Sequence, residues 1–359
     1  MSRKSYIISL LFIVSTLTLN SCGSQLHVPD ATPFSTNTLI TTDTPEPTST
    51  TTETPSPTAT KTKTHTITPT PIHPLDKLVM HKADTEILYN WFSYVPRGLN
   101  KDETIYIWVT SATTMPTDDY ENATSQIRDW LSYVTDIPDQ YNYVLLTPVI
   151  PRPQTNHIYV IAYNRAVFLN NTPAMYQRPD MQLNLMVDKL TSILQQDGYY
   201  PGEKVFLDGY SAGCMFAQRY ALLHPDRLMA VAGGQCGGSI TLADTNYAWP
   251  VGIQDFEQLT GEQFNFSEYE ELPQFYYIGS LDNNNSAVLF GNPDVYTDAQ
   301  IMNLYGLFGR EDPERLENQV QHLNSLGYTN VQFKLYPAIQ HVITPQMIKD
   351  TFNFFENYR

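Results

Sequence analysis

The sequence has only three cysteines among 359 residues and few basic side chains: 21 Lys and Arg against 37 Asp and Glu, a formal net charge of −16. Three cysteines are too few for a disulfide scaffold. The negative charge argues against nucleic acid or an anionic membrane surface as the main partner, because both require basic patches. It is compatible with a secreted protein that acts on neutral or weakly charged substrates.

Other signals of ligand binding are also absent. No group of His, Cys, Asp and Glu residues has the spacing typical of a metal site, and no glycine-rich loop has the pattern of a phosphate-binding loop. The sequence therefore implies no metal and no cofactor. It contains no internal repeat, and its length allows one large domain or two small ones.

The N-terminus has the pattern of a signal peptide. Arg3 and Lys4 form a short basic segment, and the apolar run at 6–19 is of signal-peptide length and too short to span a membrane comfortably. The run ends in LNSCGS at 19–24, which resembles a bacterial lipobox. This resemblance implies that residues 1–22 are a lipoprotein signal peptide and that Cys22 is lipidated. The alternative is a plain secretory signal with an incidental Cys22. Both readings place the protein outside the cytoplasm. A lipoprotein would contact the membrane only through its lipid, and a protein with a plain secretory signal would be secreted.

Residues 23–74 have the composition of a linker. Thr, Pro and Ser dominate them, as in TPEPTSTTTET at 44–54, and apolar periodicity is almost absent. Such a segment cannot bury enough apolar surface to offset the entropy lost on ordering. We therefore expect a disordered stalk that holds the following domain away from a membrane surface. Its Thr and Ser residues are candidate sites for O-glycans.

Residues 75–359 are predicted to form one α/β domain. Strand patterns alternate with helical patterns, which predicts a mostly parallel sheet with helices on both faces and ligands at the carboxyl ends of its strands. The residues 151–179 and the aromatic-rich insertion 244–272 follow neither pattern, and we expect the insertion to form part of a lid or pocket wall. The predicted strands are 87–95, 104–109, 143–146, 205–207, 228–232, 275–278 and 331–336, and the predicted helices are 120–134, 181–196, 214–223, 313–326 and 344–358.

The stretch KVFLDGYSAG at 204–213 joins a short apolar strand to a helical segment. Its G-x-S-x-G pattern in that context is typical of a nucleophile elbow, where a strained turn exposes the hydroxyl of Ser211. Gly209 and Gly213 leave room for the strand and helix backbones to pass close to the serine. The alternative is an ordinary strand-to-helix turn.

Four motifs together support a family resemblance: YSAG at 210–213, LHPDR at 223–227, GSLD at 279–282 and YPAIQH at 336–341. With these motifs, residues 75–359 resemble the α/β-hydrolases, in particular secreted esterases of the polyhydroxybutyrate-depolymerase and feruloyl-esterase kind. The resemblance implies the α/β-hydrolase fold and a catalytic triad in the chain order serine, acid, histidine.

Ser211, Asp282 and His341 fit that order. His341 follows the last predicted strand, where the family places its histidine, and would be the general base. Asp282 matches the family's G-x-x-D and would orient the histidine. The alternatives are that Asp282 merely lies in a polar turn, or that Asp294 is the acid.

Three other titratable residues are expected to be structural and not catalytic. His224 ends the helix after the elbow, His322 lies on a helix face that we expect to be solvated, and Asp208 precedes the elbow and so breaks the expected order. Arg152 and Arg178 either bind a substrate carboxylate or are ordinary surface arginines.

The oxyanion hole follows from the resemblance. One donor would be the backbone N–H of Ala212, and the second would be that of Ser111 or Ala112 in the loop after strand 104–109. Many relatives have His-Gly where this chain has Thr110, Ser111 and Ala112. This departure leaves the second donor open.

Cys214 and Cys236 lie near the elbow. Because the protein is expected outside the cytoplasm, they can form a disulfide. The alternative is two buried free thiols. Aromatic residues near the loops would suit an aromatic or sugar-linked substrate, although such side chains are more often core. They are Trp108, Tyr163, Tyr199, Tyr200, Tyr247, Trp249 and Tyr276.

The sequence therefore predicts a monomeric, surface-anchored serine hydrolase that cleaves carboxylic esters through an acyl-enzyme on Ser211. Aromatic, polysaccharide-linked and polyester substrates are the candidates. Two other hypotheses stay open: a serine peptidase on the same fold, and a non-catalytic binding lipoprotein that retains it.

Overall fold

The computed structural model describes residues 77–154, 158–291 and 294–359. The predicted signal peptide with Cys22 and the predicted linker at 23–74 lie outside these residues. In the described part of the chain, we find no helix with the length and apolar character needed to cross a membrane.

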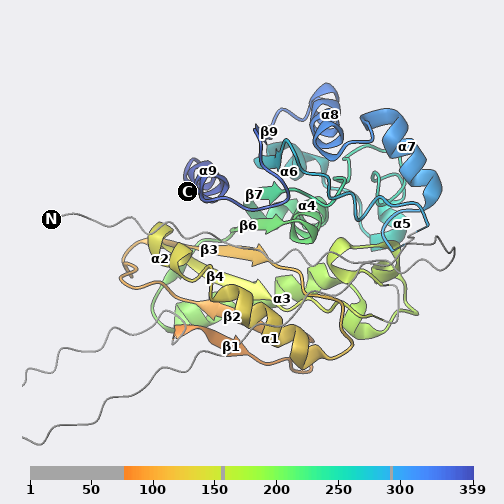
Figure 1. The fold of residues 1–359 in the computed structure, drawn as a ribbon. Helices are drawn as coiled ribbons and strands as arrows, with labels where there is room; N and C mark the ends of the chain where they lie inside the picture. The colour runs from red at the N-terminus through yellow and green to blue at the C-terminus, as the bar shows by residue number, and fades with distance from the viewer. Residues whose placement is uncertain (1–76, 155–157, 292–293) are drawn as a thin grey trace, which may run out of the picture. The chain divides into compact units, whose positions relative to one another are not determined.

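A mostly parallel sheet organises the described residues (Figure 1). β2 runs antiparallel to β1 and β4, whereas every neighbouring pair from β4 to β9 is parallel. The short β5 (Tyr200–Pro201) pairs only with β3. In spatial order the strands are β1 (Val79–His81), β2 (Trp91–Tyr94), β4 (Tyr143–Pro148), β3 (Thr104–Ser111), β6 (Val205–Tyr210), β7 (Leu228–Gly234), β8 (Gln274–Gly279) and β9 (Val331–Tyr336).

Alternating side chains of the central strands enter two separate cores. Ile107 and Val109 of β3 belong to one apolar cluster, whereas Trp108 between them belongs to the other. Neighbouring β4 alternates in the same way, with Val144 in the first cluster and Leu145 in the second. Successive residues of a strand point to opposite faces, so a sheet that is apolar on both faces must be covered on both.

Helices cover each face. α3 (Pro179–Gln196), α4 (Ala212–Leu223) and α8 (Asp312–Ser325) contribute to the cluster that contains Val109. α1 (Tyr120–Leu131) and α9 (Pro345–Glu356) contribute to the cluster around Trp108, and α2 (Asp136–Tyr141) lies at its margin. Figure 1 shows α4 beside β6 and β7. The predicted α/β class, with a mostly parallel sheet and helices on both faces, is confirmed.

The long helix α3 illustrates how the sequence determines an element. Its buried residues Leu183, Met186, Leu190 and Leu194 recur at intervals of three or four, which places them on one face. The helix begins at Pro179, two residues before the predicted start at 181, so Asp180 lies within its first turn. There Asp180 contacts the neighbouring Arg178 and the distant His224, as described below.

The irregular segments contain short elements that the sequence patterns did not predict. Residues 151–179 include three 3₁₀ turns, and the insertion 244–272 includes two short helices. Three aromatic side chains of this insertion are buried, those of Trp249, Phe256 and Tyr269. Trp249 is 1% exposed, and its Nε1 donates to the carbonyl of Tyr163 at 2.7 Å. These elements are η2 (Val160–Ala162), η3 (Arg165–Phe168), η4 (Ala174–Tyr176), α5 (Phe256–Thr260) and α6 (Phe266–Glu271); η5 (Pro225–Arg227) and α7 (Asp298–Phe308) lie elsewhere.

The packing of α9 onto the sheet yields a stability prediction. Phe352 is 1% exposed, and its ring lies 5.0 Å from that of Trp108 and 4.2 Å from that of Tyr141. We expect Phe352→Ala to lower the free energy of unfolding by about 3–5 kcal/mol, through lost burial and a residual cavity. Phe266→Ala, at a ring that is 44% exposed, should cost far less. Urea unfolding of both variants tests this; equal losses would contradict the packing role of α9.

Candidate active site

The predicted elbow is a tight turn between β6 and α4. Ser211 has φ 57° and ψ −122°, a conformation that non-glycine residues rarely adopt. A Cβ atom on Gly209 would lie well under 3.0 Å from the carbonyl oxygen of Gly213, and one on Gly213 equally close to that of Ser111. Both glycines are therefore required by the close approach of the backbones. The N–H of Ser211 donates to the carbonyl of Gly234 on β7 at 2.8 Å.

Three predicted site residues meet at the carboxyl ends of the strands. His341 Nε2 lies 3.0 Å from Ser211 Oγ, and His341 Nδ1 lies 2.9 Å from Asp282 Oδ2. Asp282 has a fully buried side chain, whereas that of His341 is 22% exposed. A carboxylate accepts only, so Nδ1 carries the proton and Nε2 presents a lone pair to the serine hydroxyl. The carboxylate that meets His341 is that of Asp282 and not that of Asp294.

The loops that carry Asp282 and His341 are joined to each other. The N–H of Leu281 donates to the carbonyl of Ile339 at 2.9 Å, and the N–H of Ala338 donates to Ser280 Oγ at 2.8 Å. A Cβ on Gly279 would collide with the same Ile339 carbonyl. The acid and the histidine are thus positioned by backbone contacts between their loops.

Gln235, just after β7, forms a hydrogen bond with the loop that carries His341. Its Nε2 donates to the carbonyl of Gln340 at 3.0 Å, and its Oε1 accepts the hydroxyl of Tyr210. The ring of Tyr210 lies 5.2 Å from that of His341. Burial, together with the nearby carboxylate of Asp282, raises the pKa of Tyr210, so its phenol stays protonated.

The candidate oxyanion donors flank the elbow. Ala212 is the first residue of α4, where backbone N–H groups have no acceptor within the helix. Ser111 ends β3, and its hydroxyl donates to the carbonyl of Gly213 at 2.8 Å. Ala112 follows directly and is 7% exposed. Arg152 holds this loop, since its Nη1 donates to the carbonyl of Thr114 at 2.8 Å.

The other singled-out charged residues lie away from the serine and have protein partners. Asp180 Oδ2 lies 2.8 Å from His224 Nε2 and 2.7 Å from Arg178 Nη2, so Arg178 holds a carboxylate of the chain itself. His322 is not simply solvated as predicted: its Nε2 lies 2.8 Å from a carboxylate oxygen of the buried Asp244, and its side chain is 28% exposed.

Cys214 and Cys236 are joined by a disulfide, with their Cα atoms 4.8 Å apart. The bond ties the start of α4 to the segment that follows β7. Most of the aromatic residues singled out above belong to the core, since Trp108, Tyr163, Trp249 and Tyr276 are each at most 2% exposed. Tyr200 is 66% exposed.

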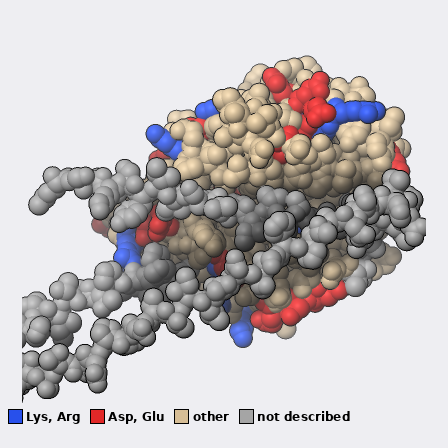
Figure 2. Space-filling view, viewed as in Figure 1, with Lys and Arg blue, Asp and Glu red and all other residues tan. Residues whose placement is uncertain are grey.

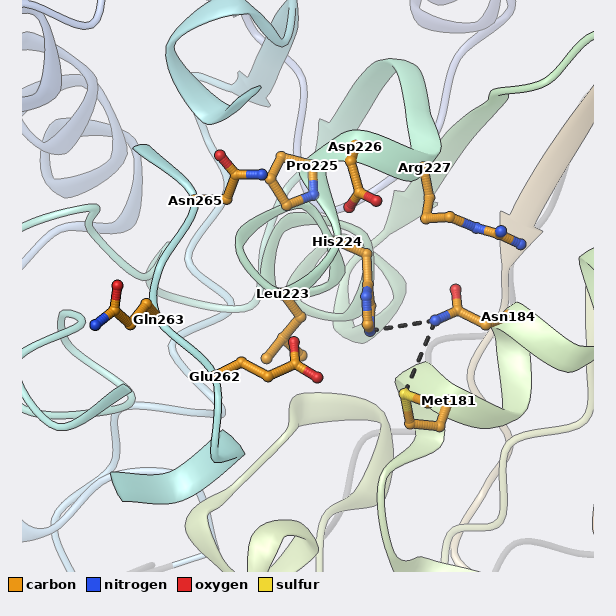
Figure 3. A pocket seen from close by; sticks show the side chains of 10 residues that line it. All are labelled: Met181, Asn184, Leu223, His224, Pro225, Asp226, Arg227, Glu262, Gln263 and Asn265. Atoms are coloured by element: carbon orange, nitrogen blue, oxygen red, sulfur yellow. Dashed lines mark hydrogen bonds between the residues drawn. The ribbon is translucent and has the colours of Figure 1, made fainter. Parts of the chain in front are cut away.

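A pocket of about 390 Å³ lies at the far end of α4 (Figure 3). Figure 3 shows His224 facing Asn184 there, and insertion residues Glu262, Gln263 and Asn265 form one wall. Ser211 precedes the other end of this 12-residue helix, about 18 Å away at 1.5 Å per residue. The predicted pocket wall is therefore present, but it borders this pocket and not the serine.

Acidic and basic side chains are distributed differently over the surface. On the face shown in Figure 2, outside the grey atoms, basic side chains occur singly and acidic ones gather in groups. Within the described residues, no group of three or more His, Cys, Asp or Glu side chains is placed to hold a metal ion.

Sequence reasoning missed the residues that support the site. Gln235 bonds the loop of His341, the amide of Asn284 lies 3.0 Å from His341 Nε2, and Asn285 accepts a hydrogen bond from Arg315. The run of three asparagines after Asp282 was the only signal, and it suggested a polar turn. Gln235 has a left-handed φ of 50°, which no pattern around it predicts.

Comparisons with known proteins agree with the fold. No protein-family model matches the chain, and no curated protein matches it in sequence. Similar solved structures include LpqC, a poly(3-hydroxybutyrate) depolymerase from Bordetella parapertussis, at 15% identity and a TM-score of 0.52, covering 79% of this chain and 90% of that one. Poly(aspartic acid) hydrolase-1 from Sphingomonas sp. KT-1 is similar at 14% identity and a TM-score of 0.51, covering 78% of this chain and 95% of that one. The chain has the α/β-hydrolase fold, as the sequence motifs implied.

The buried carboxyl of Asp208, beside the elbow, yields a pH prediction. Burial raises its pKa to about 6. The folded protein then binds this proton more tightly than the unfolded chain, so stability falls as pH rises from about 4 to about 6. Asp208→Asn removes this penalty. We expect the variant to gain up to about 3 kcal/mol relative to the parent protein across that range.

Urea unfolding of both proteins at pH 4, 5, 6 and 7 measures this difference. Asp226→Asn, at an exposed carboxylate, measures the effect of a lost charge alone. A constant difference between Asp208→Asn and the parent protein at all four pH values would contradict the prediction.

Proposed function

We propose that this protein is a serine hydrolase that cleaves carboxylic esters through an acyl-enzyme on Ser211. The observation that supports it most directly is the hydrogen-bonded chain from Ser211 Oγ through both nitrogens of His341 to the buried Asp282. A serine in a strained turn, a base within 3.0 Å of it and an acid that orients the base form the arrangement that nucleophilic catalysis requires.

In the proposed reaction, Ser211 Oγ attacks the ester carbonyl carbon while its proton passes to His341 Nε2. Asp282 stabilises the resulting imidazolium through Nδ1–H. The carbon–oxygen bond to the alcohol then breaks, and the alcohol oxygen takes the proton from Nε2. Water, deprotonated by His341, releases the acid and restores the serine hydroxyl.

The oxyanion would be held by the backbone N–H of Ala212 and by a second N–H from Ser111 or Ala112. We favour Ala112, because it directly follows the strand end that contacts the elbow, and because Arg152 anchors its loop. Such donors act through geometry, so the absence of His-Gly in this loop does not prevent them from serving.

For the substrate we propose an ester with an aromatic, sugar-linked or polymeric part. The support is the sequence resemblance and a fold shared with a protein described as a poly(3-hydroxybutyrate) depolymerase. A fold shared with a poly(aspartic acid) hydrolase makes polypeptides the natural comparison substrate.

Hydrolysis of chromogenic esters by the purified chain and its Ser211→Ala variant tests the reaction. We expect kcat/KM to fall by about four orders of magnitude or more, because the variant lacks the nucleophile. The panel contains short acyl, feruloyl and polyhydroxybutyrate esters with peptide anilides beside them. If none is cleaved and a fluorophosphonate probe leaves Ser211 unlabelled, the proposal is wrong and a binding role takes its place.

We further propose that Cys22 carries a lipid that anchors the protein outside the cytoplasm, with residues 23–74 as the stalk. In a bacterium that processes lipoproteins, the full chain should then incorporate labelled palmitate and sediment with membranes, whereas Cys22→Ser should incorporate no label. Equal absence of label from the two proteins would rule out the anchor.

A further inference from the structure

The base of the site has a second hydrogen-bond donor besides the serine. Asn284 Nδ2 lies 3.0 Å from His341 Nε2, the same distance as Ser211 Oγ. The Oδ1 atom of Asn284 faces the N–H of Ser286 at 3.4 Å, which leaves the amide nitrogen directed at the ring. A neutral imidazole nitrogen has a single lone pair, so the amide and the hydroxyl share it.

The loop that carries Asn284 is held in place independently of this contact. The backbone N–H of Asn284 donates to Asp282 Oδ1 at 2.9 Å. The next residue, Asn285, accepts a hydrogen bond through its side chain from Arg315 of α8, whose side chain is fully buried. The amide of Asn284 is therefore presented to His341 by a fixed loop, and its side chain is not needed to hold Asp282.

Proton transfer to His341 Nε2 removes the hydrogen-bond acceptor of the Asn284 amide. Once Nε2 has taken the proton from Ser211, it is a donor, and the N–H of Asn284 loses its acceptor. The leaving-group oxygen must then lie within hydrogen-bond reach of Nε2–H. Asn284 Nδ2 lies on that same side of the ring, because it is already directed at the Nε2 lone pair from 3.0 Å.

We propose that Asn284 acts directly at the site of proton transfer: its amide N–H rests on His341 Nε2 in the free protein and moves to the leaving-group oxygen when the ester reacts. This inference rests on the proposed hydrolase function. The resting contact favours the neutral ring, and the later contact assists departure of the alcohol.

Charged and titratable groups around His341, in the described part of the chain, come from three elements. Asp282 follows β8, Tyr210 ends β6, and α8 supplies Asp312 and Arg315. Burial, with the nearby carboxylate of Asp282, raises the pKa of Asp312 to about 7, and Arg315 opposes this shift. Asp312 therefore changes its charge near pH 7. Its effect is shared by the parent protein and all variants at position 284, so it cancels in their comparison.

The test measures the rate at which a fluorophosphonate probe labels Ser211 as a function of pH, with the full chain purified in detergent. Asn284→Ala removes the donor and keeps the backbone N–H that holds Asp282. We expect the acidic limb of the profile to move up by about half a pH unit to one unit. Asn284→Asp has the same shape but places a carboxylate beside the ring, and should move the limb further in the same direction. Asn283→Ala, at the exposed neighbour, is the matched control and should leave it in place.

A second readout uses the leaving group. The substrates are an alkyl ester and the 4-nitrophenyl ester of the same acid. The loss of kcat/KM in Asn284→Ala should be about three- to ten-fold larger on the alkyl ester, because departure of an alkoxide depends more on a hydrogen-bond donor than departure of 4-nitrophenolate does.

The inference is overturned if the labelling profiles of Asn284→Ala and Asn284→Asp both coincide with that of Asn283→Ala, or if the two esters lose activity equally. Failure of the parent protein to react with the probe would instead refute the hydrolase proposal itself, and this inference with it. The two failures are therefore distinguishable.

Discussion

The backbone turn at Ser211 is the constraint on which the rest of the site depends. A left-handed φ of 57° at a serine costs on the order of 1–3 kcal/mol, and it persists only where the surroundings determine it. Here the surroundings are backbone atoms: Gly209 and Gly213 allow β6, α4 and the end of β3 to come into contact, and the hydroxyl of Ser111 bonds the carbonyl of Gly213. The same contacts that tolerate the strain aim the serine side chain away from the sheet edge.

From that turn outward, the parallel sheet explains why the partners converge. β6, β8 and β9 have their carboxyl ends on one edge, so the segments that follow them must meet there. Their alignment is set by hydrogen bonds between loops, as between Leu281 and Ile339, and by the bridge from Gln235 to Gln340. In both of these bonds the partner in the histidine loop is a main-chain carbonyl, so the position of His341 depends on the backbone path of that loop.

This division explains what the sequence could and could not predict. The alternation of strand and helix patterns was sufficient for the fold class, and the elbow glycines identified a turn whose steric demand is local. Chain order and strand ends singled out Ser211, Asp282 and His341, which the structure brings together. Non-local contacts were beyond reach. Asp180 lies inside α3, where it contacts His224 from the end of α4 as well as the nearby Arg178. Three aromatic side chains of the insertion 244–272 belong to a core formed by distant segments, which its sequence pattern did not reveal.

The three asparagines after Asp282 show why composition alone underestimates such a loop. Their side chains have different surroundings: Asn283 is exposed, Asn284 faces the lone pair of His341, and Asn285 binds a buried arginine of α8. A buried carboxylate must have each oxygen satisfied, because an unpaired charge in a low dielectric is costly. His341 Nδ1 and the backbone N–H of Asn284 meet that need at Asp282. The backbone N–H of Asn284 thus binds the carboxylate of Asp282, while its side-chain amide contacts the ring of His341. One residue of a polar turn therefore contacts two members of the hydrogen-bonded chain that ends at Ser211.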